Sequence, residues 1–297
     1  MEPLPQEVTR ADRLRNLRRS GGFFPLEQKS RIRLTGADRV RYLNGQLTVD
    51  IFKLAEGIAL PALLLTAKGK LCAPLFVSKD GDSLVVEIEE CLREQTLARL
   101  DQYIISDDVA LEDYTPTSPG FHVFGTVAPP ADALKISRLG VGGFDTGHEP
   151  ADLPMADAGE IEFLRIERAL PRWGFELDSN TLPQEARLDS SSVDFNKGCY
   201  VGQEVVSRLK SVGRVNRRLH AFRGSLEPTT EERLFLHLPG RTGEPAGVLT
   251  SRCCDFELAQ TIALGYLNRE FEDSGSFVAA DSAGNALGKF EKRPILT

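Results

Sequence analysis

The chain has 297 residues, of which 41% are hydrophobic and 27% charged, and its formal net charge is −7 with a sequence pI near 5.3. Its length suits two domains, or one elaborate domain with a smaller appendage, and its composition is that of a globular protein able to bury a sizeable core. Phosphate binding is driven by cationic surface, so the negative charge argues against a protein that coats nucleic acid broadly.

The cysteines and the N-terminus bear on the cellular compartment. Five cysteines without a CxxC spacing predict neither a disulfide framework nor a zinc or iron–sulfur cluster motif, and this usage is typical of a reducing cytoplasm. No apolar run is long enough to cross a bilayer, and residues 1–20 lack the apolar core of a secretion signal. We expect a cytoplasmic monomer with no bound metal and no membrane contact. The arginines among residues 10–19 indicate a solvated first helix, with an organellar transit peptide as the alternative.

The first half of the chain predicts an α+β fold. A short strand at 32–34 is followed by a turn at Gly36-Ala37-Asp38 and a helix with Val40, Leu43 and Leu47 on one face. Three strands separated by glycine-containing turns, an amphipathic helix and two further strands follow: 62–66, 71–78, 83–89, the helix 91–103, 109–112 and 121–127. Helices and antiparallel strands in one stretch indicate a sheet with helices on one face.

The second half changes character twice. Residues 127–154 are rich in Gly and Pro and predict loops around a short element, and a helix over 158–170 should end before Pro171. A polar connection, 178–196, leads to a series of short strands typical of a small antiparallel barrel or sandwich. These predicted strands cover 219–223, 234–237, 247–250, 262–267, 276–280 and 286–290. We therefore expect an α+β region of two subdomains over 1–215 and a C-terminal β-barrel domain over 216–297.

The sequence lacks the common catalytic signatures. It has no Walker A sequence, no GxGxxG after a strand and no GxSxG elbow. The four histidines lie far apart, at no helical metal-ligand spacing. What remains is a binding pocket and one thiol.

The most informative segment is Lys197-Gly198-Cys199-Tyr200-Val201-Gly202-Gln203-Glu204. It sets a cysteine between a cation and the predicted start of a helix, and both features stabilise a thiolate, the form in which sulfur reacts or binds metal. The two glycines let backbone approach a ligand closely. The alternative is a buried structural cysteine in a tight turn, because free cysteine often serves as a small hydrophobic residue.

The second candidate site is the end of the predicted helix over 158–170. Glu167 lies in its last turn, where the helix macrodipole is negative, so we expect its carboxylate either to pair with Arg165 or Arg168 or to accept hydrogen bonds from a ligand. Trp173 follows the proline, and an indole beside a carboxylate suits a flat heterocycle. The alternative is a core tryptophan that seals the helix end.

A run of cations is the third feature. Residues 205–226 contain no Asp or Glu but carry six cations, Arg208, Lys210, Arg214, Arg217, Arg218 and Arg223. Such a run usually forms a solvated helix face. Beside a pocket it would also attract a polyanion such as a glutamate tail or a phosphate backbone.

Taken as an ordered series, these segments resemble the YgfZ-type, folate-binding branch of the glycine-cleavage T-protein (aminomethyltransferase) superfamily, whose eukaryotic relatives act in mitochondrial iron–sulfur cluster assembly. The cysteine segment is specific, and the other segments are weak singly but strong together. The series covers nearly the whole chain: Gly36–Asp38, Tyr42–Asp50, Thr66–Lys70, Arg165–Gly174, Leu182–Ala186, the cysteine segment, Gly213–Leu219 and Ile262–Tyr266.

The resemblance implies an α+β folate-binding region of two subdomains and a C-terminal barrel around a central channel. It implies a tetrahydrofolate-binding accessory protein that supports iron–sulfur cluster assembly or repair and, through it, tRNA modification. Its partners would be folate and the iron–sulfur assembly machinery or client enzymes. Glu167 matches the superfamily's pterin-binding glutamate, Trp173 matches a pocket aromatic, and Cys199 is the family's signature thiol. We expect Cys199 and Lys197 to be the catalytic residues, and Tyr200, Gln203, Glu204 and Arg208 to bind the cofactor together with Glu167 and Trp173.

One departure separates the chain from true aminomethyltransferases. These carry paired aspartates after the glycine of the central hairpin, where this chain has Gly69-Lys70-Leu71-Cys72-Ala73-Pro74. We therefore do not expect a conventional enzyme. A folate-dependent aminomethyltransferase or other one-carbon transferase is the alternative, and an RNA-interaction protein using the cation run is the third hypothesis, which the net charge disfavours.

Overall fold

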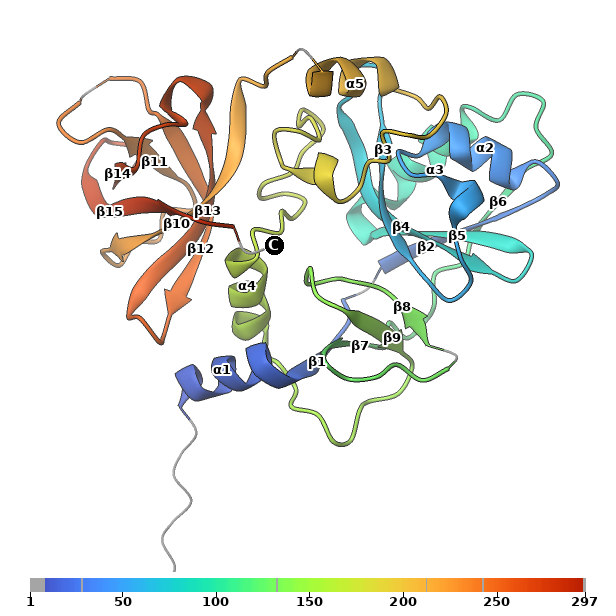
Figure 1. The fold of residues 1–297 in the computed structure, drawn as a ribbon, viewed down its shortest axis with the longest axis horizontal. Coiled ribbons are helices and arrows are strands. Elements are labelled where there is room, and N and C mark those ends of the chain that lie inside the picture. The colour runs from blue at the N-terminus through green and yellow to red at the C-terminus, as the bar shows by residue number, and fades with distance from the viewer. Residues whose placement is uncertain (1–8, 28, 132, 212, 242, 296–297) are drawn as a thin grey trace, which may run out of the picture.

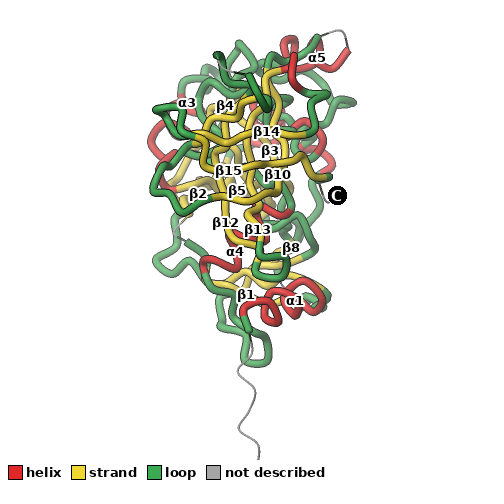
Figure 2. Tube along the Cα trace, turned by 90° about the vertical axis from the view of Figure 1, so that its left-hand side faces the viewer, coloured by secondary structure: helices red, strands yellow, loops and turns green. Residues whose placement is uncertain are grey.

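Three β-structures surround the centre of the molecule, as the computed structural model shows (Figure 1). A closed barrel lies on one side, a five-stranded sheet on the other and a four-stranded sheet below, and the view at right angles shows that the molecule is flat (Figure 2). The structure describes residues 9–27, 29–131, 133–211, 213–241 and 243–295. The expected α+β class with a C-terminal barrel is confirmed.

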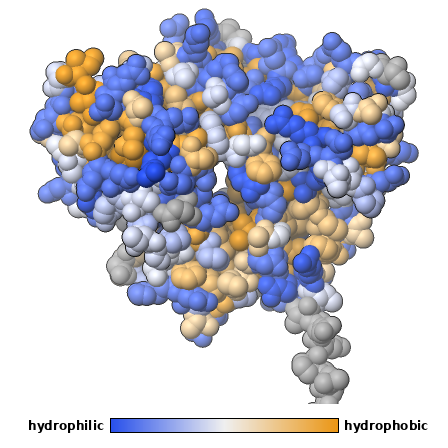
Figure 3. Space-filling view, turned by 180° about the vertical axis from the view of Figure 1, so that it is seen from behind, coloured by the Kyte–Doolittle hydropathy of each residue, from blue (hydrophilic) through white to orange (hydrophobic). Residues whose placement is uncertain are grey.

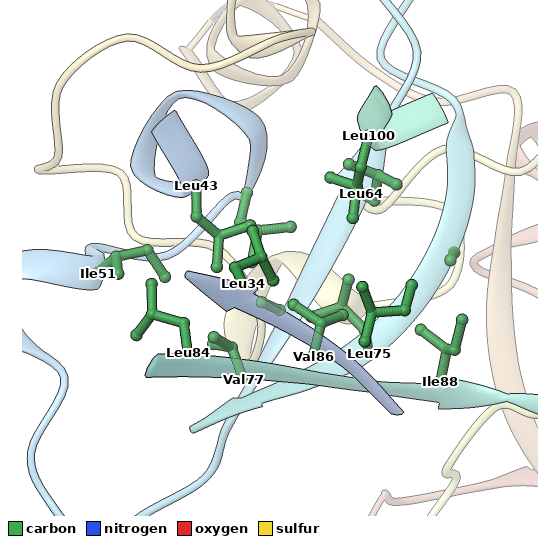
Figure 4. Close-up of a cluster of buried hydrophobic side chains, with 14 of the residues drawn as sticks. Leu34, Leu43, Ile51, Leu64, Leu75, Val77, Leu84, Val86, Ile88 and Leu100 are labelled. Carbon is green, nitrogen blue, oxygen red and sulfur yellow. The ribbon is translucent and has the colours of Figure 1, made fainter. Parts of the chain in front are cut away.

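The five-stranded sheet has the strand order β3-β4-β5-β2-β6, with all neighbours antiparallel. The strands are β2 (Lys29–Thr35), β3 (Leu60–Leu65), β4 (Leu71–Asp80), β5 (Ser83–Glu89) and β6 (Ala110–Asp113). Helices α2 (Arg39–Gln46) and α3 (Arg93–Asp101) pack on one face, and Figure 4 shows Leu43 and Leu100 pointing at the sheet leucines. Short 3-10 helices precede β3 and α3: Ile51–Lys53 and Glu90–Leu92.

The four-stranded sheet was only partly expected. Its order is β1-β7-β9-β8, with β1 (Gly21–Pro25), β7 (Phe121–Gly125), β8 (Leu134–Lys135) and β9 (Gly143–Thr146). The Gly- and Pro-rich stretch supplies β8 and β9, which are too short for a sequence pattern to reveal. At Gly21, φ is +86° and an added Cβ would lie 2.0 Å from the carbonyl oxygen of Phe124, so only glycine allows β1 to pair with β7.

Two helices join this sheet to the barrel. In α1 (Arg10–Ser20), Leu14 and Leu17 are buried, so the expectation of a solvated first helix is wrong for one face. Helix α4 (Ala158–Glu167) begins with a capping box between Asp157 and Glu160 and ends three residues earlier than expected. Buried residues of both helices belong to one apolar cluster with the outer wall of the barrel.

The barrel is closed by six antiparallel strands in the order β10-β13-β12-β11-β14-β15, which decides between the expected barrel and sandwich. Its own interior is a second apolar cluster. The strands are β10 (Arg217–Leu226), β11 (Leu234–His237), β12 (Gly247–Asp255), β13 (Gln260–Asn268), β14 (Ser276–Ala280) and β15 (Ala286–Arg293), with a 3-10 helix at Arg269–Phe271.

The polar connection predicted for 178–196 contains one 3-10 turn, η3 (Leu188–Ser190), and leads to α5 (Gln203–Ser211). None of the helices among the described residues is long and apolar enough to span a bilayer.

Replacing Leu17 by Ala tests the packing of α1. The leucine is 3% exposed in the cluster shared with α4 and the barrel, so its truncation should lower the free energy of unfolding by about 2–5 kcal/mol. Urea denaturation measures the change. Arg19→Ala, on the exposed side of the same helix, is the control. Equal, small effects of the two substitutions would show that α1 does not belong to the core.

Candidate functional site

The thiol of Cys199 lies on the surface, in the loop that leads into α5. The loop passes over the hairpin between β3 and β4. At Gly202, φ is +88° and an added Cβ would lie 2.6 Å from the carbonyl oxygen of Thr66, so glycine is needed where the two segments approach. The expected order of loop, thiol and helix start is therefore present.

Lys197 holds this loop against α2. Its buried ammonium donates hydrogen bonds to the carbonyl oxygens of Asn44 at 2.5 Å and Leu47 at 2.7 Å. These oxygens lie at the C-terminal end of α2, where carbonyls lack helical partners and the macrodipole favours a cation. Burial lowers the pKa of Lys197 to about 8, and the nearby carboxylates of Asp50 and Asp194 act in the opposite direction.

The segment 42–50 supplies the floor for the loop. The backbone N–H of Val201 donates to the carbonyl oxygen of Gly45 at 3.1 Å, and that of Asp194 donates to the carbonyl oxygen of Thr48 at 2.9 Å. The Thr48 hydroxyl, fully buried, donates to the carbonyl oxygen of Ser192 at 2.5 Å. One of the segments that carries the family resemblance therefore positions the cysteine loop from 150 residues away. The sequence alone did not predict that segment 42–50 supports the cysteine loop.

Tyr200 turns inward from the same loop. Its ring packs among leucines of β3 and β4, the Lys197 ammonium lies 5.1 Å from the ring centroid, and the buried hydroxyl has no hydrogen-bond partner. Burial raises the pKa of Tyr200 to about 12. Trp173, half-buried, packs against the same apolar cluster, so the structure brings these two predicted residues together.

The other predicted residues near Cys199 lie on α5. The side-chain amide of Gln203 is 3.5 Å from the carbonyl oxygen of Lys197, while Glu204 and Arg208 are exposed. Gln184, which sequence reasoning missed, is buried beneath this helix. Its amide N–H donates to the carbonyl oxygen of Val206 at 2.9 Å, and its side-chain oxygen has no partner.

Glu167 lies at a separate place, where α4 meets α1 and the barrel. Its carboxylate pairs with Arg18 of α1, and the same guanidinium pairs with Glu257. The expectation that Arg165 or Arg168 would be the partner is wrong. Arg165 instead pairs with Glu162 at 2.7 Å and with Glu176 at 3.0 Å. A partner 149 residues away leaves no local pattern in the sequence.

Further guanidinium groups surround Glu167. Arg293 of β15 donates to the carbonyl oxygens of Ile166 at 2.7 Å and Glu167 at 2.8 Å. Burial lowers the pKa of Arg168, and its buried Nη1 has no hydrogen-bond partner. With Arg18, the cluster has more donors than this one carboxylate can satisfy, which favours an additional acceptor at this position.

The buried carboxylate of Glu176 holds the fold together and is not available to a ligand. Its side chain is fully buried, receives hydrogen bonds from the hydroxyls of Thr250 at 2.7 Å and Ser251 at 2.5 Å, and pairs with Arg165. The backbone N–H of Arg172 donates to it at 3.0 Å. All its acceptor capacity is used in joining the segment after α4 to β12.

The predicted residues thus form two groups: the cysteine loop with Trp173, and Glu167 with its arginines. Among the described residues, no hydrogen bond or ion pair joins the two groups. A space-filling view shows an opening near the middle of the molecule (Figure 3). A separate hollow of about 400 Å³, lined by Phe76, Glu87 and Ile136 among others, lies on the five-stranded sheet and contains none of the predicted site residues.

Comparisons with known proteins agree with this architecture. No family model matches the chain. Relatives named "tRNA-modifying protein YgfZ" from Shigella dysenteriae serotype 1 and Escherichia coli K12 are each 27% identical, with 84% of this chain and 86% of the relative covered. The crystal structure of the glycine cleavage system aminomethyltransferase T from Bartonella henselae matches with a TM-score of 0.76 and 16% identity, covering 99% of this chain and 91% of that chain.

Replacing Lys197 by Met tests how the cysteine loop is held. The methionine keeps the length of the side chain but leaves two carbonyl oxygens of α2 without donors, so the free energy of unfolding should fall by about 1–3 kcal/mol. Urea denaturation measures the change, and alkylation of Cys199, followed by peptide mapping, should accelerate as the loop loosens. Lys68→Met, in the exposed turn between β3 and β4, is the matched control. A Lys197→Met protein as stable as the control would contradict this account.

Proposed function

We propose that this chain, a YgfZ-type member of the glycine-cleavage T-protein superfamily, is a tetrahydrofolate-binding accessory protein that supports iron–sulfur cluster assembly or repair. Through those clusters it would serve tRNA modification, the activity for which its Shigella and Escherichia relatives are named. Its place of action in this proposal is the cytoplasm, and its partners are the iron–sulfur assembly machinery or client enzymes.

The observation that carries the proposal is the exposed thiol of Cys199 on a loop with a fixed backbone. Exposure lets a second protein reach the sulfur. Lys197 and the glycine at 202 hold the loop at the start of α5, where unpaired backbone N–H groups favour a negative charge. In the thiolate form, Cys199 would bind iron of a metal–sulfur species carried by a client and shield it from oxidation. Because the Lys197 ammonium is hydrogen-bonded to carbonyl oxygens of α2, it affects Cys199 mainly by fixing the backbone of the loop.

The folate would lie at the group around Glu167. When bound as tetrahydrofolate, it supplies a flat pterin and an anionic glutamate tail. The buried Nη1 of Arg168 lacks an acceptor, which the carbonyl oxygen of the pterin would supply. Trp173 is half-buried and belongs to the cysteine-loop group, so it would stack on the part of the ligand that extends toward that loop. Glu167 would accept hydrogen bonds from the pterin once Arg18 gives up its place.

Residues of the cysteine loop and of α5 would complete the proposed cofactor site. The Tyr200 hydroxyl is unpartnered but buried, so it would reach a ligand only from the inner side of the loop, and Gln203, Glu204 and Arg208 would offer polar groups near the thiol. We assign these roles because the four residues follow Cys199 closely, in the same loop and in α5.

The alternative function, aminomethyl transfer to folate, would need a carboxylate after Gly69, and this chain has none in that segment. The first strand residues after Gly69 provide a leucine that is fully buried and Cys72, whose thiol pKa is raised by burial. Neither supplies a negative charge at neutral pH: leucine does not ionise and the Cys72 thiol keeps its proton, whereas an aspartate is ionised and can accept one. The 16% identity to the Bartonella aminomethyltransferase supports a common fold only.

Cys199→Ser should abolish support of iron–sulfur enzymes while leaving stability unchanged, because serine keeps the size of the side chain but is no thiolate ligand. The measurement is complementation of a deletion strain, read out as activity of iron–sulfur enzymes and as thiolated tRNA. Cys254→Ser, which removes another exposed thiol, is the matched control. Full complementation by Cys199→Ser would refute the thiol mechanism.

Titration with tetrahydrofolate by calorimetry should separate the residues around Glu167. Arg18→Met removes the competing cation and should tighten binding several-fold, whereas Glu167→Gln removes the acceptor and should weaken it about tenfold. Trp173→Ala should weaken binding about 10–100-fold through lost stacking area.

Arg15→Met is the control for Arg18→Met, because Arg15 pairs with Glu257 at 3.2 Å but not with Glu167. Unchanged affinity in both Glu167→Gln and Trp173→Ala would remove those residues from the pocket. Weaker binding in Arg18→Met would show that this arginine is part of the folate site and not its competitor.

A further inference from the structure

A second group of cations lies where the connection 178–196 meets the barrel. It consists of Arg187, Arg218 and His220 of β10, and Lys292 of β15, with Glu272 beside them. The connection, coloured yellow in Figure 1, passes between the barrel and the five-stranded sheet. Neither the thiol nor the proposed folate group uses these residues.

Two half-buried guanidinium groups, those of Arg187 and Arg218, lie close enough for their charges to repel, and neither forms an ion pair among the described residues. Among the described residues, neither Arg187 nor Arg218 has a carboxylate oxygen within 4.0 Å. The Nε of Arg218 is buried with no partner, and Arg187 uses its Nε on the carbonyl oxygen of Leu219 at 2.6 Å. The preceding residue of the strand, Arg217, does pair with Glu185 at 3.3 Å. An arginine of this segment can therefore find a carboxylate, and Arg218 does not.

The backbone at Arg187 is held in an uncommon conformation. Its φ of +60° and ψ of +21° are left-handed, which costs free energy for a residue with a Cβ. Glycine would relieve the cost, and an arginine there places a guanidinium next to Arg218 instead. Arg187 therefore combines a strained backbone with a guanidinium that has no ion-pair partner among the described residues, a combination typical of binding sites.

His220 completes the group. Its Nε2 lies 3.5 Å from the carboxylate of Glu272, too far for a good hydrogen bond, and has no hydrogen-bond partner. Burial lowers the pKa of His220 to about 4, and the positive charges of Arg187 and Lys292 add to this effect. Glu272 acts in the opposite direction, and the ammonium of Lys292 donates to its backbone carbonyl, not to its carboxylate.

We propose that Arg187, Arg218 and His220 form a binding site for a phosphate group. A tetrahedral phosphate has enough oxygens to accept hydrogen bonds from two guanidinium groups and an imidazolium, here two groups of β10 and one of the connection that precedes it. A planar carboxylate offers only two oxygens. Asp189 and Glu272 limit the excess positive charge, so a single phosphate matches the site.

Bound phosphate would also stabilise the protonated form of His220 and so raise its pKa. With the anion absent, its neighbours repel the charge; with the anion present, the protonated ring donates to it. The folded, phosphate-bound protein therefore holds this proton to higher pH than the free protein, and phosphate affinity should rise as pH falls toward the new pKa.

The test is an NMR titration of the His220 imidazole between pH 3.5 and 8, with and without 20 mM inorganic phosphate at equal ionic strength. The assignment comes from His220→Asn, and His122, His148 and His237 serve as internal references. We expect phosphate to raise the pKa of His220 by about one unit and to leave the references unchanged. No change in His220 would overturn the proposal.

Substitutions distinguish a built site from general attraction. Arg187→Gln should raise the phosphate-free pKa of His220 and weaken phosphate binding about tenfold, and Arg218→Gln should also weaken it. Arg214→Gln removes an equal charge from an exposed position of the same basic run and should change neither quantity. Equal weakening by Arg187→Gln and Arg214→Gln would overturn the proposal.

A final arm identifies the source of the phosphate. A mononucleotide and a short single-stranded RNA are each added to the phosphate-bound protein. Displacement of phosphate by RNA at micromolar concentration, with the same Arg187 dependence, would assign the site to a nucleic-acid backbone, and displacement by the mononucleotide alone would assign it to a small phosphate ester. Both results support the site, whereas increased His220 protonation by chloride at the same ionic strength contradicts it.

Discussion

A single buried ammonium determines the position of the exposed thiol. Lys197 reaches under its own loop to two carbonyl oxygens at the end of α2, a place where a helix leaves acceptors unsatisfied. Its charge is costly to bury, which the lowered pKa of about 8 reflects, so the arrangement persists only because the acceptors surround it. Cys199, two residues further on, is exposed as a result, and Tyr200 is directed into the apolar cluster.

The sequence was sufficient for elements with a strong periodic pattern. The meander of β3, β4 and β5 was expected close to its observed bounds and the barrel strands at their observed places, because alternating apolar residues and glycine turns mark them. β10 and β12 are each five residues longer than expected. β1, β8 and β9 were not expected. β8 has two residues, and β1 depends on Gly21, whose need for a positive φ appears only when β7 lies beside it.

The candidate site shows the same division. The thiol, the cation and the glycine before α5 are consecutive in sequence, so their neighbourhood could be predicted. The partner of Glu167 could not, since Arg18 comes from the first helix and the choice among several arginines is made by tertiary packing. The buried carboxylate of Glu176 was missed for a similar reason: its donors on β12 follow it by more than 70 residues.

The apolar cluster shared by α1, α4 and the outer wall of the barrel has a consequence for the barrel taken by itself. Leu219, Ala221 and Leu264 of the barrel point outward into that cluster, where a free-standing barrel would present polar residues to water. This barrel, separated from α1 and α4, would expose an apolar surface to water. Joining the barrel to another protein would therefore require either the transfer of α1 and α4 with it or new residues that cover this surface.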